Sequence, residues 1–160
     1  MTTETAVDCT TLAIEQVAGI IAGHAVFQSA VNATSEDEAR TRIFKSFYRP
    51  PEQEVDQAFA VVFEQPGTRW DRLSDGTQIP KGTVFLHLGY PMELSEDNEG
   101  EERRFNNWHG QLAQAVSEYY GPGYRLLTTI TDPPSRTHPK DEGSTVAIWE
   151  VGYSVEWSCF

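Results

Sequence analysis

The chain has 160 residues, of which 39% are hydrophobic, and its 12 basic and 24 acidic residues give a formal net charge of −12. This length suits one domain, and 8 Phe, 6 Tyr and 4 Trp supply a core that an intrinsically disordered chain lacks. The charge argues against tight binding to nucleic acids or anionic membranes, because both interactions depend on basic residues that meet phosphates. We expect no transmembrane segment, since no apolar stretch approaches the ~18–20 residues of a membrane span.

Two helices are expected in the first third of the chain. Over residues 10–27, apolar residues recur near helical spacing, although two glycines inside the segment lower its helix propensity. The second helix should begin at Ser35, because Ser35 and Glu38 have the spacing of a capping box. Pro50-Pro51 would end it. Its buried face would be formed by Ala39, Ile43, Phe44 and Phe47.

The sequence pattern in the middle of the chain predicts two strands. Residues 58–64 are apolar and β-prone, and residues 83–90 alternate in the way that places side chains on opposite faces of a strand. Between them, residues 70–82 predict a loop or a short hairpin that turns at Ser74-Asp75-Gly76.

The second half predicts one helix and two further strands. Residues 93–102 contain six acids, so we expect a solvated loop there. An amphipathic helix is expected to follow over residues 101–120. A strand over residues 124–131 follows, and then an exposed, charged loop at residues 132–143. The chain ends in a strand over residues 145–157, whose alternating pattern predicts one dry and one wet face.

This order of elements predicts an α+β fold: a mainly antiparallel four-stranded sheet with helices packed on one face, in a two-layer sandwich. The whole chain, residues 1–160, is expected to be one domain with residues 132–143 as an exposed loop or arm. The last strand would extend about 43 Å at 3.3 Å per residue, which is longer than most strands in a small domain. We therefore expect part of it to pair outside its own domain, because exposed strand edges invite pairing with another chain.

The sequence contains no recognisable catalytic or metal-binding motif. It lacks GxGxxG, a Walker-type Gly-Lys-Ser/Thr, GxSxG and HExxH, and no two of its four histidines have ligand spacing. We assign no catalytic, cofactor-binding or metal-binding residue and expect no cofactor and no enzymatic activity. The alternative is a small enzyme or ligand-binding domain whose pocket is built from Trp70, His87, Trp108 and His109.

Two cysteines, Cys9 and Cys159, lie near opposite ends of the chain and do not have CxxC spacing. A reducing compartment is the simplest interpretation, and a Cys9–Cys159 disulfide stays open. The N-terminus has no basic region, so we expect no secretory signal.

The segment Phe105-Asn106-Asn107-Trp108-His109-Gly110 resembles the Phe-x-Asn-x-x-Gly start of a helix in the tail terminator group of tailed-bacteriophage tail completion proteins. In that group, as in this sequence, the helix follows a strand and an acidic loop. A strand, a charged loop containing Arg and a final strand of Tyr/Phe-x-Val-x-Trp type come next; here the ending is Tyr153-Ser-Val-Glu-Trp157. The upstream strand Phe59-Ala-Val-Val-Phe63 also fits, whereas the lead-in with two helices is longer than in the group.

The resemblance implies a structural virion protein of the phage tail or neck, assembled in the host cytoplasm. Such proteins form a ring, typically a hexamer, that caps the tail tube and joins it to the head–tail connector or stopper protein. DNA may pass through the ring without tight binding, which an acidic subunit allows. Other neck or minor tail proteins are the alternatives within this class.

Ring closure requires that one surface of a subunit meets a different surface of the next. The charged loop and the last strand are the candidate surfaces. The side chains expected at this interface are Arg136, His138, Lys140, Asp141, Tyr153, Val155 and Trp157.

Overall fold

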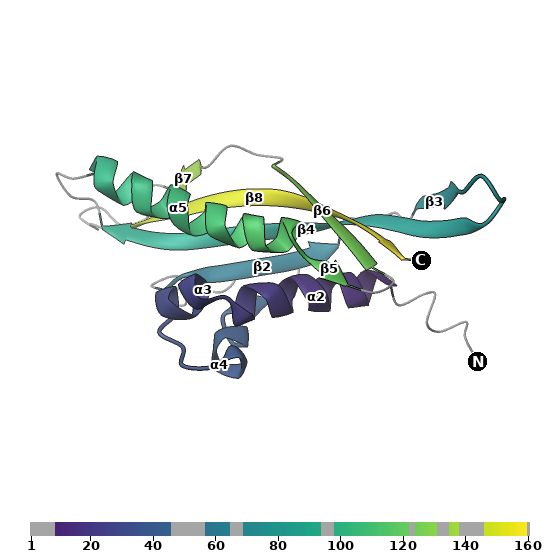
Figure 1. Ribbon diagram of the computed structural model, residues 1–160. Helices are drawn as coiled ribbons and strands as arrows, with labels where there is room; N and C mark the ends of the chain where they lie inside the picture. Colours follow the sequence, from purple (N-terminus) through teal and green to yellow (C-terminus); the bar gives the residue numbers. More distant parts are fainter. Residues whose placement is uncertain are drawn as a thin grey trace.

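The computed structural model describes residues 9–45, 57–64, 69–93, 98–121, 124–130, 135–137 and 146–159. Four helices and eight strands occur in this part of the chain (Figure 1). The helices are α2 (Cys9–Gly23), α3 (Ala25–Ala30), α4 (Glu36–Arg40) and α5 (Asn98–Ser117). The strands are β1 (Ile43–Phe44), β2 (Phe59–Glu64), β3 (Arg69–Arg72), β4 (Gln78–Glu93), β5 (Tyr120–Gly121), β6 (Tyr124–Ile130), β7 (Ser135–Thr137) and β8 (Val146–Cys159).

The predicted fold class is confirmed: the protein is α+β, with helices on a mixed, mostly antiparallel sheet. The strand order is β1-β2-β4-β8-β6-β5, with β3 paired to β4 and β7 paired to β8. The four expected strands are β2, β4, β6 and β8, and the four additional strands have only two to four residues each. Only one pair in this sheet, β1 with β2, is parallel.

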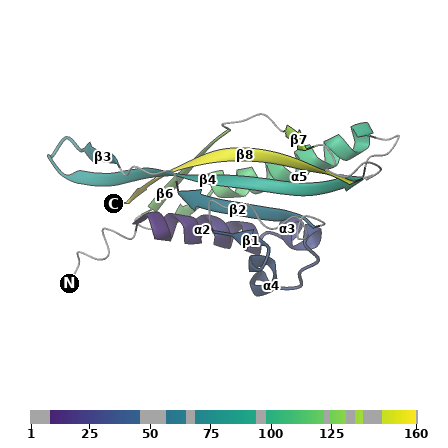
Figure 2. The ribbon, with the colours of Figure 1, turned by 180° about the vertical axis from the view of Figure 1, so that it is seen from behind.

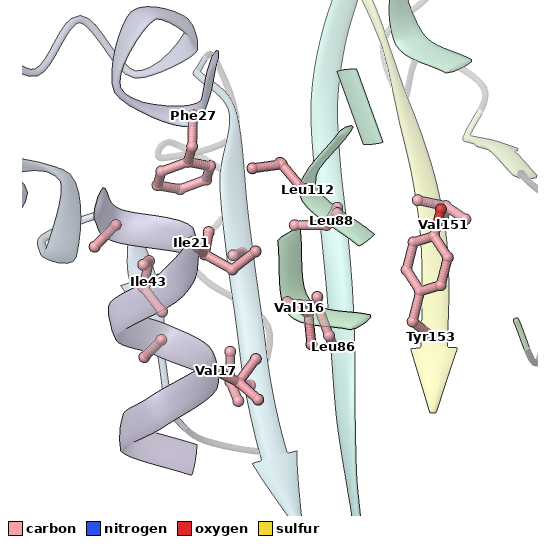
Figure 3. Packing of buried hydrophobic residues seen from close by; sticks show 14 of the residues in the cluster. Val17, Ile21, Phe27, Ile43, Leu86, Leu88, Leu112, Val116, Val151 and Tyr153 are labelled. Carbon is pink, nitrogen blue, oxygen red and sulfur yellow. The ribbon is translucent and has the colours of Figure 1, made fainter. Parts of the chain in front are cut away.

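The helical layer and the sheet enclose one apolar core. Alternate residues of β2, β4 and β8 point to the same face, so that Val62, Leu86 and Tyr153 lie across neighbouring strands. Figure 3 shows Ile21 of α2 and Leu112 of α5 directed toward this face. All five side chains are at most 2% exposed. Burial of a large aliphatic or aromatic side chain contributes about 1.5–3 kcal/mol, so this layer contact stabilises the fold.

The N-terminal helical region differs from the prediction in two places. The expected helix over residues 10–27 is broken at His24, whose Nδ1 atom accepts a hydrogen bond from the Val26 N–H (3.2 Å) and caps a separate helix, α3. The N-cap at Ser35 is confirmed, because the Ser35 Oγ atom accepts from the Glu38 N–H at 3.2 Å, but the Glu38 carboxylate accepts from the Thr34 N–H (2.7 Å) and not from that of Ser35. The helix that follows nevertheless ends at Arg40.

Ile43 and Phe44 belong to β1 and not to the second helix. Ile43 lies opposite Ala60, and Phe44 opposite Val61, on the edge of the sheet. A β-branched residue and an aromatic residue suit this pleated edge, and tertiary pairing overrides the local helical pattern. Ile43 is buried as expected, although in a strand. Phe47 lies outside the described residues.

The predicted hairpin at residues 70–82 is confirmed and extends the sheet. β3 and the first residues of β4 form a two-stranded ribbon, here defined as residues 69–82. Its turn is closed by a hydrogen bond from the Leu73 N–H to the Thr77 carbonyl (2.7 Å), and Gly76 adopts a φ of +88°, which suits a glycine. Figures 1 and 2 both show the ribbon projecting beyond the helices at one end of the molecule.

The expectation that the last strand pairs outside its domain is wrong. β8 is a central strand: it pairs with β4 from Val146 to Ser158, and on its other side it pairs with β6 and β7. Its length is matched by β4, which has 16 residues and not the eight that the sequence pattern predicts. β8 therefore offers no long free edge in the described part of the sheet.

The loops at residues 93–102 and 132–143 are shorter than predicted where the structure describes them. β4 continues to Glu93 and α5 already begins at Asn98. Residues 135–137 of the expected loop form β7 and pair with β8. The remainder of that loop lies outside the described residues.

Candidate functional site

The four side chains considered for an enzymatic pocket do not come together. Trp70 lies in the ribbon, and Trp108 and His109 lie on α5. His87 pairs with Val61 and Gly152, and therefore lies on the opposite sheet face from Leu86 and the helical layer. Its ring is 5.9 Å from that of Phe63. The sheet thus separates His87 from His109.

His109 belongs to a buried hydrogen-bonded group that joins α5 to β8. Its Nδ1 atom lies 2.5 Å from the Tyr153 Oη atom, and its Nε2 atom lies 3.2 Å from the Asn106 Oδ1 atom. The amide oxygen of Asn106 can only accept, so Nε2–H donates to it and the Tyr153 hydroxyl donates to Nδ1. Both ring nitrogens are satisfied by this arrangement.

Burial keeps this pair uncharged near neutral pH. It lowers the pKa of His109 below its ordinary value and raises the pKa of Tyr153 to about 12. His109 also contacts the ring of Phe105 at 4.8 Å between centroids. A neutral imidazole with both nitrogens occupied positions α5 on the sheet, and we assign it no catalytic step.

The predicted interface side chains on β8 are corrected by the structure. Tyr153, Val155 and Trp157 are 2%, 0% and 2% exposed, because they face the helical layer and belong to the core. A partner cannot reach them in the folded subunit. Arg136 has its backbone in β7, opposite Trp149. His138, Lys140 and Asp141 lie outside the described residues, and their role stays a prediction.

A hollow of about 550 Å³ lies between α3 and α5. Tyr90 of β4 and Trp108 of α5 supply aromatic surface to it, and their ring centroids are 5.0 Å apart in an edge-on arrangement. The Trp108 Nε1–H donates to the Val26 carbonyl (3.2 Å), which ties α5 to α3. The hollow is lined by Ala25, Val26, Ser29, Ala30, Asn32, Tyr90, Arg104, Asn107, Trp108 and Gln111.

The ribbon exposes two large apolar side chains that the core does not use. Trp70 is 56% exposed and Leu73 is 44% exposed. Trp70 and Arg72 share one face of the ribbon with Gln78 and Pro80. Tryptophan is a residue that folded proteins bury to a high degree on average, so this tip is an unusual surface.

The sequence named Trp70 and Trp108 only as parts of one enzymatic or ligand-binding pocket and did not predict these two separate surfaces. Two large apolar residues just before a polar turn, Trp70 and Leu73 ahead of Ser74-Asp75-Gly76, were the available signal for the ribbon. The hollow had no such signal, because it depends on how α3, α5 and β4 are placed relative to one another.

The described residues show no metal centre and no membrane-spanning helix. No group of three His, Cys, Asp or Glu residues is close enough to hold a metal ion in these segments. Within the same segments, every helix is too short or too polar to cross a bilayer.

No protein-family profile matches the sequence, and no curated protein matches it. A solved structure whose title states no function is similar over 82% of this chain and 91% of that chain, with 15% sequence identity and a TM-score of 0.28. A similarity this low does not establish a shared fold.

Proposed function

We propose that this protein is a structural subunit of a tailed-bacteriophage virion, a tail terminator that forms a ring of six copies. The ring would cap the tail tube and join it to the head–tail connector or stopper protein. It would assemble in the host cytoplasm and become part of the neck of the virion.

The observation that carries the proposal is the ribbon. An isolated subunit gains nothing from projecting Trp70 and Leu73 into water, whereas a subunit that assembles buries them against a neighbour. Aromatic side chains are enriched in the centre of protein interfaces, where they supply much of the binding free energy.

The order of elements supports the same proposal. The segment beginning at Phe105 lies in α5, which follows strand β4 and an acidic sequence and precedes β6, β7 and β8. This is the order on which the resemblance to tail terminators rests. The acidic composition is compatible with a ring through which DNA passes, because such a surface does not hold phosphates.

The test is assembly of the purified full-length chain, followed by sedimentation velocity over a wide range of concentrations and by electron microscopy with purified tail tubes. We expect concentration-dependent closed rings and a ring at one end of each tube. A chain that stays monomeric at the highest concentration and does not bind tubes or connector contradicts the proposal.

The same experiment separates the closest alternative. A tail-tube or minor tail protein would polymerise into tubes or decorate their length instead of capping one end. The images therefore decide between a terminator and these other tail proteins.

A further inference from the structure

We infer that the hollow between α3 and α5 receives the ribbon of a second copy of this chain, with Trp70 as the side chain that enters it. The inference rests on the proposed ring function and names the two surfaces through which the ring closes. Neither surface includes β8 or the loop at residues 132–143.

The hollow has the size and lining that a large aromatic side chain requires. Its volume of about 550 Å³ lies within the ~300–1,000 Å³ of sites that enclose small ligands. Tyr90 is half-buried and presents ring surface to an entering indole, and aromatic pairs favour edge-on or offset contacts. Trp108 also lines the hollow but is only 6% exposed, with its ring packed edge-on against Tyr90. Asn107 and Gln111 line the same hollow and supply polar groups for the indole N–H.

The ribbon and the hollow lie at opposite ends of the molecule. Figures 1 and 2 both place β3 at one end of the molecule and α3 at the other, with α5 beginning near the α3 end. An interface between two different surfaces at opposite ends is heterologous, so it joins copies head to tail and closes into a ring when the rotation per subunit allows.

The ribbon and the rest of the chain carry net charges of opposite sign. The ribbon contains three basic and two acidic residues, a net charge of +1, while the remaining residues carry a net charge of −13. Near the hollow, the described acidic residues Glu99 and Glu101 of α5 are paired with Arg103 and Arg104, and Arg104 lines the hollow. Insertion of Trp70 brings Arg72, on the same face of the ribbon, toward a subunit body whose net charge is negative.

The experiment removes each surface separately. Trp70→Ala removes the entering side chain, and Ser29→Trp fills the hollow from an exposed position on α3. The matched controls are Trp70→Phe, which keeps an aromatic ring, and Gln114→Ala, at an exposed position of α5 that belongs to neither the hollow nor the ribbon. Circular dichroism and thermal unfolding establish that each variant folds, and Gln111→Trp fills the hollow from α5 if Ser29→Trp does not fold.

Sedimentation equilibrium measures the dissociation constant between copies. We expect Trp70→Ala and Ser29→Trp each to raise it by about tenfold or more, as for a central aromatic residue of an interface. Gln114→Ala should leave it unchanged, and Trp70→Phe should change it less than Trp70→Ala.

A mixture of the two deficient variants gives the decisive result. A Trp70→Ala subunit retains its hollow and a Ser29→Trp subunit retains its ribbon, so an equimolar mixture should form dimers with one intact contact and no larger species. Absence of these dimers, or normal association of either deficient variant, overturns the inference but leaves the ring proposal standing if the unmodified chain still forms rings. An unmodified chain that remains monomeric overturns both.

Discussion

A substitution at Gly82 tests whether the core dictates how the ribbon leaves the sheet. Gly82 lies opposite Trp157 where β4 passes from the ribbon into the body of the sheet, and the indole ring covers it. A Cβ atom at this position would lie 2.5 Å from Cζ2, 2.7 Å from Cε2 and 2.9 Å from Nε1 of Trp157. Ordinary van der Waals contact begins at 3.4 Å, so in Gly82→Ala the ring must move by about 1 Å.

Trp157 is 2% exposed, so its ring is enclosed by the core and cannot swing into solvent. Overpacking of this kind costs about 1–3 kcal/mol, which exceeds the ~0.5–1 kcal/mol that alanine gains over glycine in a strand. We expect a lower free energy of unfolding, and a melting temperature that falls by about 2–4 °C for each kcal/mol in a chain of this length.

Urea unfolding followed by tryptophan fluorescence measures the change. Gly110→Ala on α5 is the matched control, because a Cβ there meets nothing within 4 Å, and it should stabilise the protein by about 0.5–1 kcal/mol. The double variant Gly82→Ala with Trp157→Phe should lose less than the sum of the two single variants, since the smaller ring leaves room for the methyl group. A Gly82→Ala protein as stable as the unmodified chain would refute the argument.

Three further predictions concern the core and the buried hydrogen bonds. Tyr153→Phe should lower the free energy of unfolding by about 1–3 kcal/mol, measured in urea, because it leaves the buried Nδ1 atom of His109 without a donor; an unchanged stability would mean that this hydrogen bond contributes nothing. The pKa of His109 is lowered in the folded state, so the unfolded chain binds the proton more readily and the free energy of unfolding should decrease as the pH falls below about 6.5. His109→Asn should show a shallower decrease over that range. Equal pH dependence in the variant and the unmodified chain would contradict the assignment of this decrease to His109. Leu112→Ala should cost about 2–5 kcal/mol through the cavity that it leaves under α5, and a loss below 1 kcal/mol would show that α5 packs loosely.

Local sequence signals predicted the parts of the fold that short-range chemistry determines. The Ser35 cap, the turn at Ser74-Asp75-Gly76 and the apolar stripe of α5 each depend on residues a few positions apart. The alternation in β4 and β8 predicted correctly which side chains share a face of the sheet.

Features that depend on distant residues were missed or assigned wrongly. The strand at Ile43–Phe44 arises where a helical pattern meets the edge of β2, whereas the break at His24 is a local cap that the helical spacing concealed. The same holds for β8, whose length indicated an exposed edge until β4 proved long enough to pair with it. Alternation identified the dry face of β8 but not what covers it, so Trp157 was placed at an interface although it belongs to the core.

β4 connects the two ends of the subunit without interruption, from Gln78 in the ribbon to Glu93 near the start of α5. It is hydrogen-bonded to β8 along 13 consecutive residue pairs, which would have to slide together for the strand to be pulled out. In a ring joined ribbon to hollow, tension along the circumference would therefore act lengthwise on this ladder. Such a collar would resist internal pressure by shear of its backbone hydrogen bonds, and not by the strength of its loops.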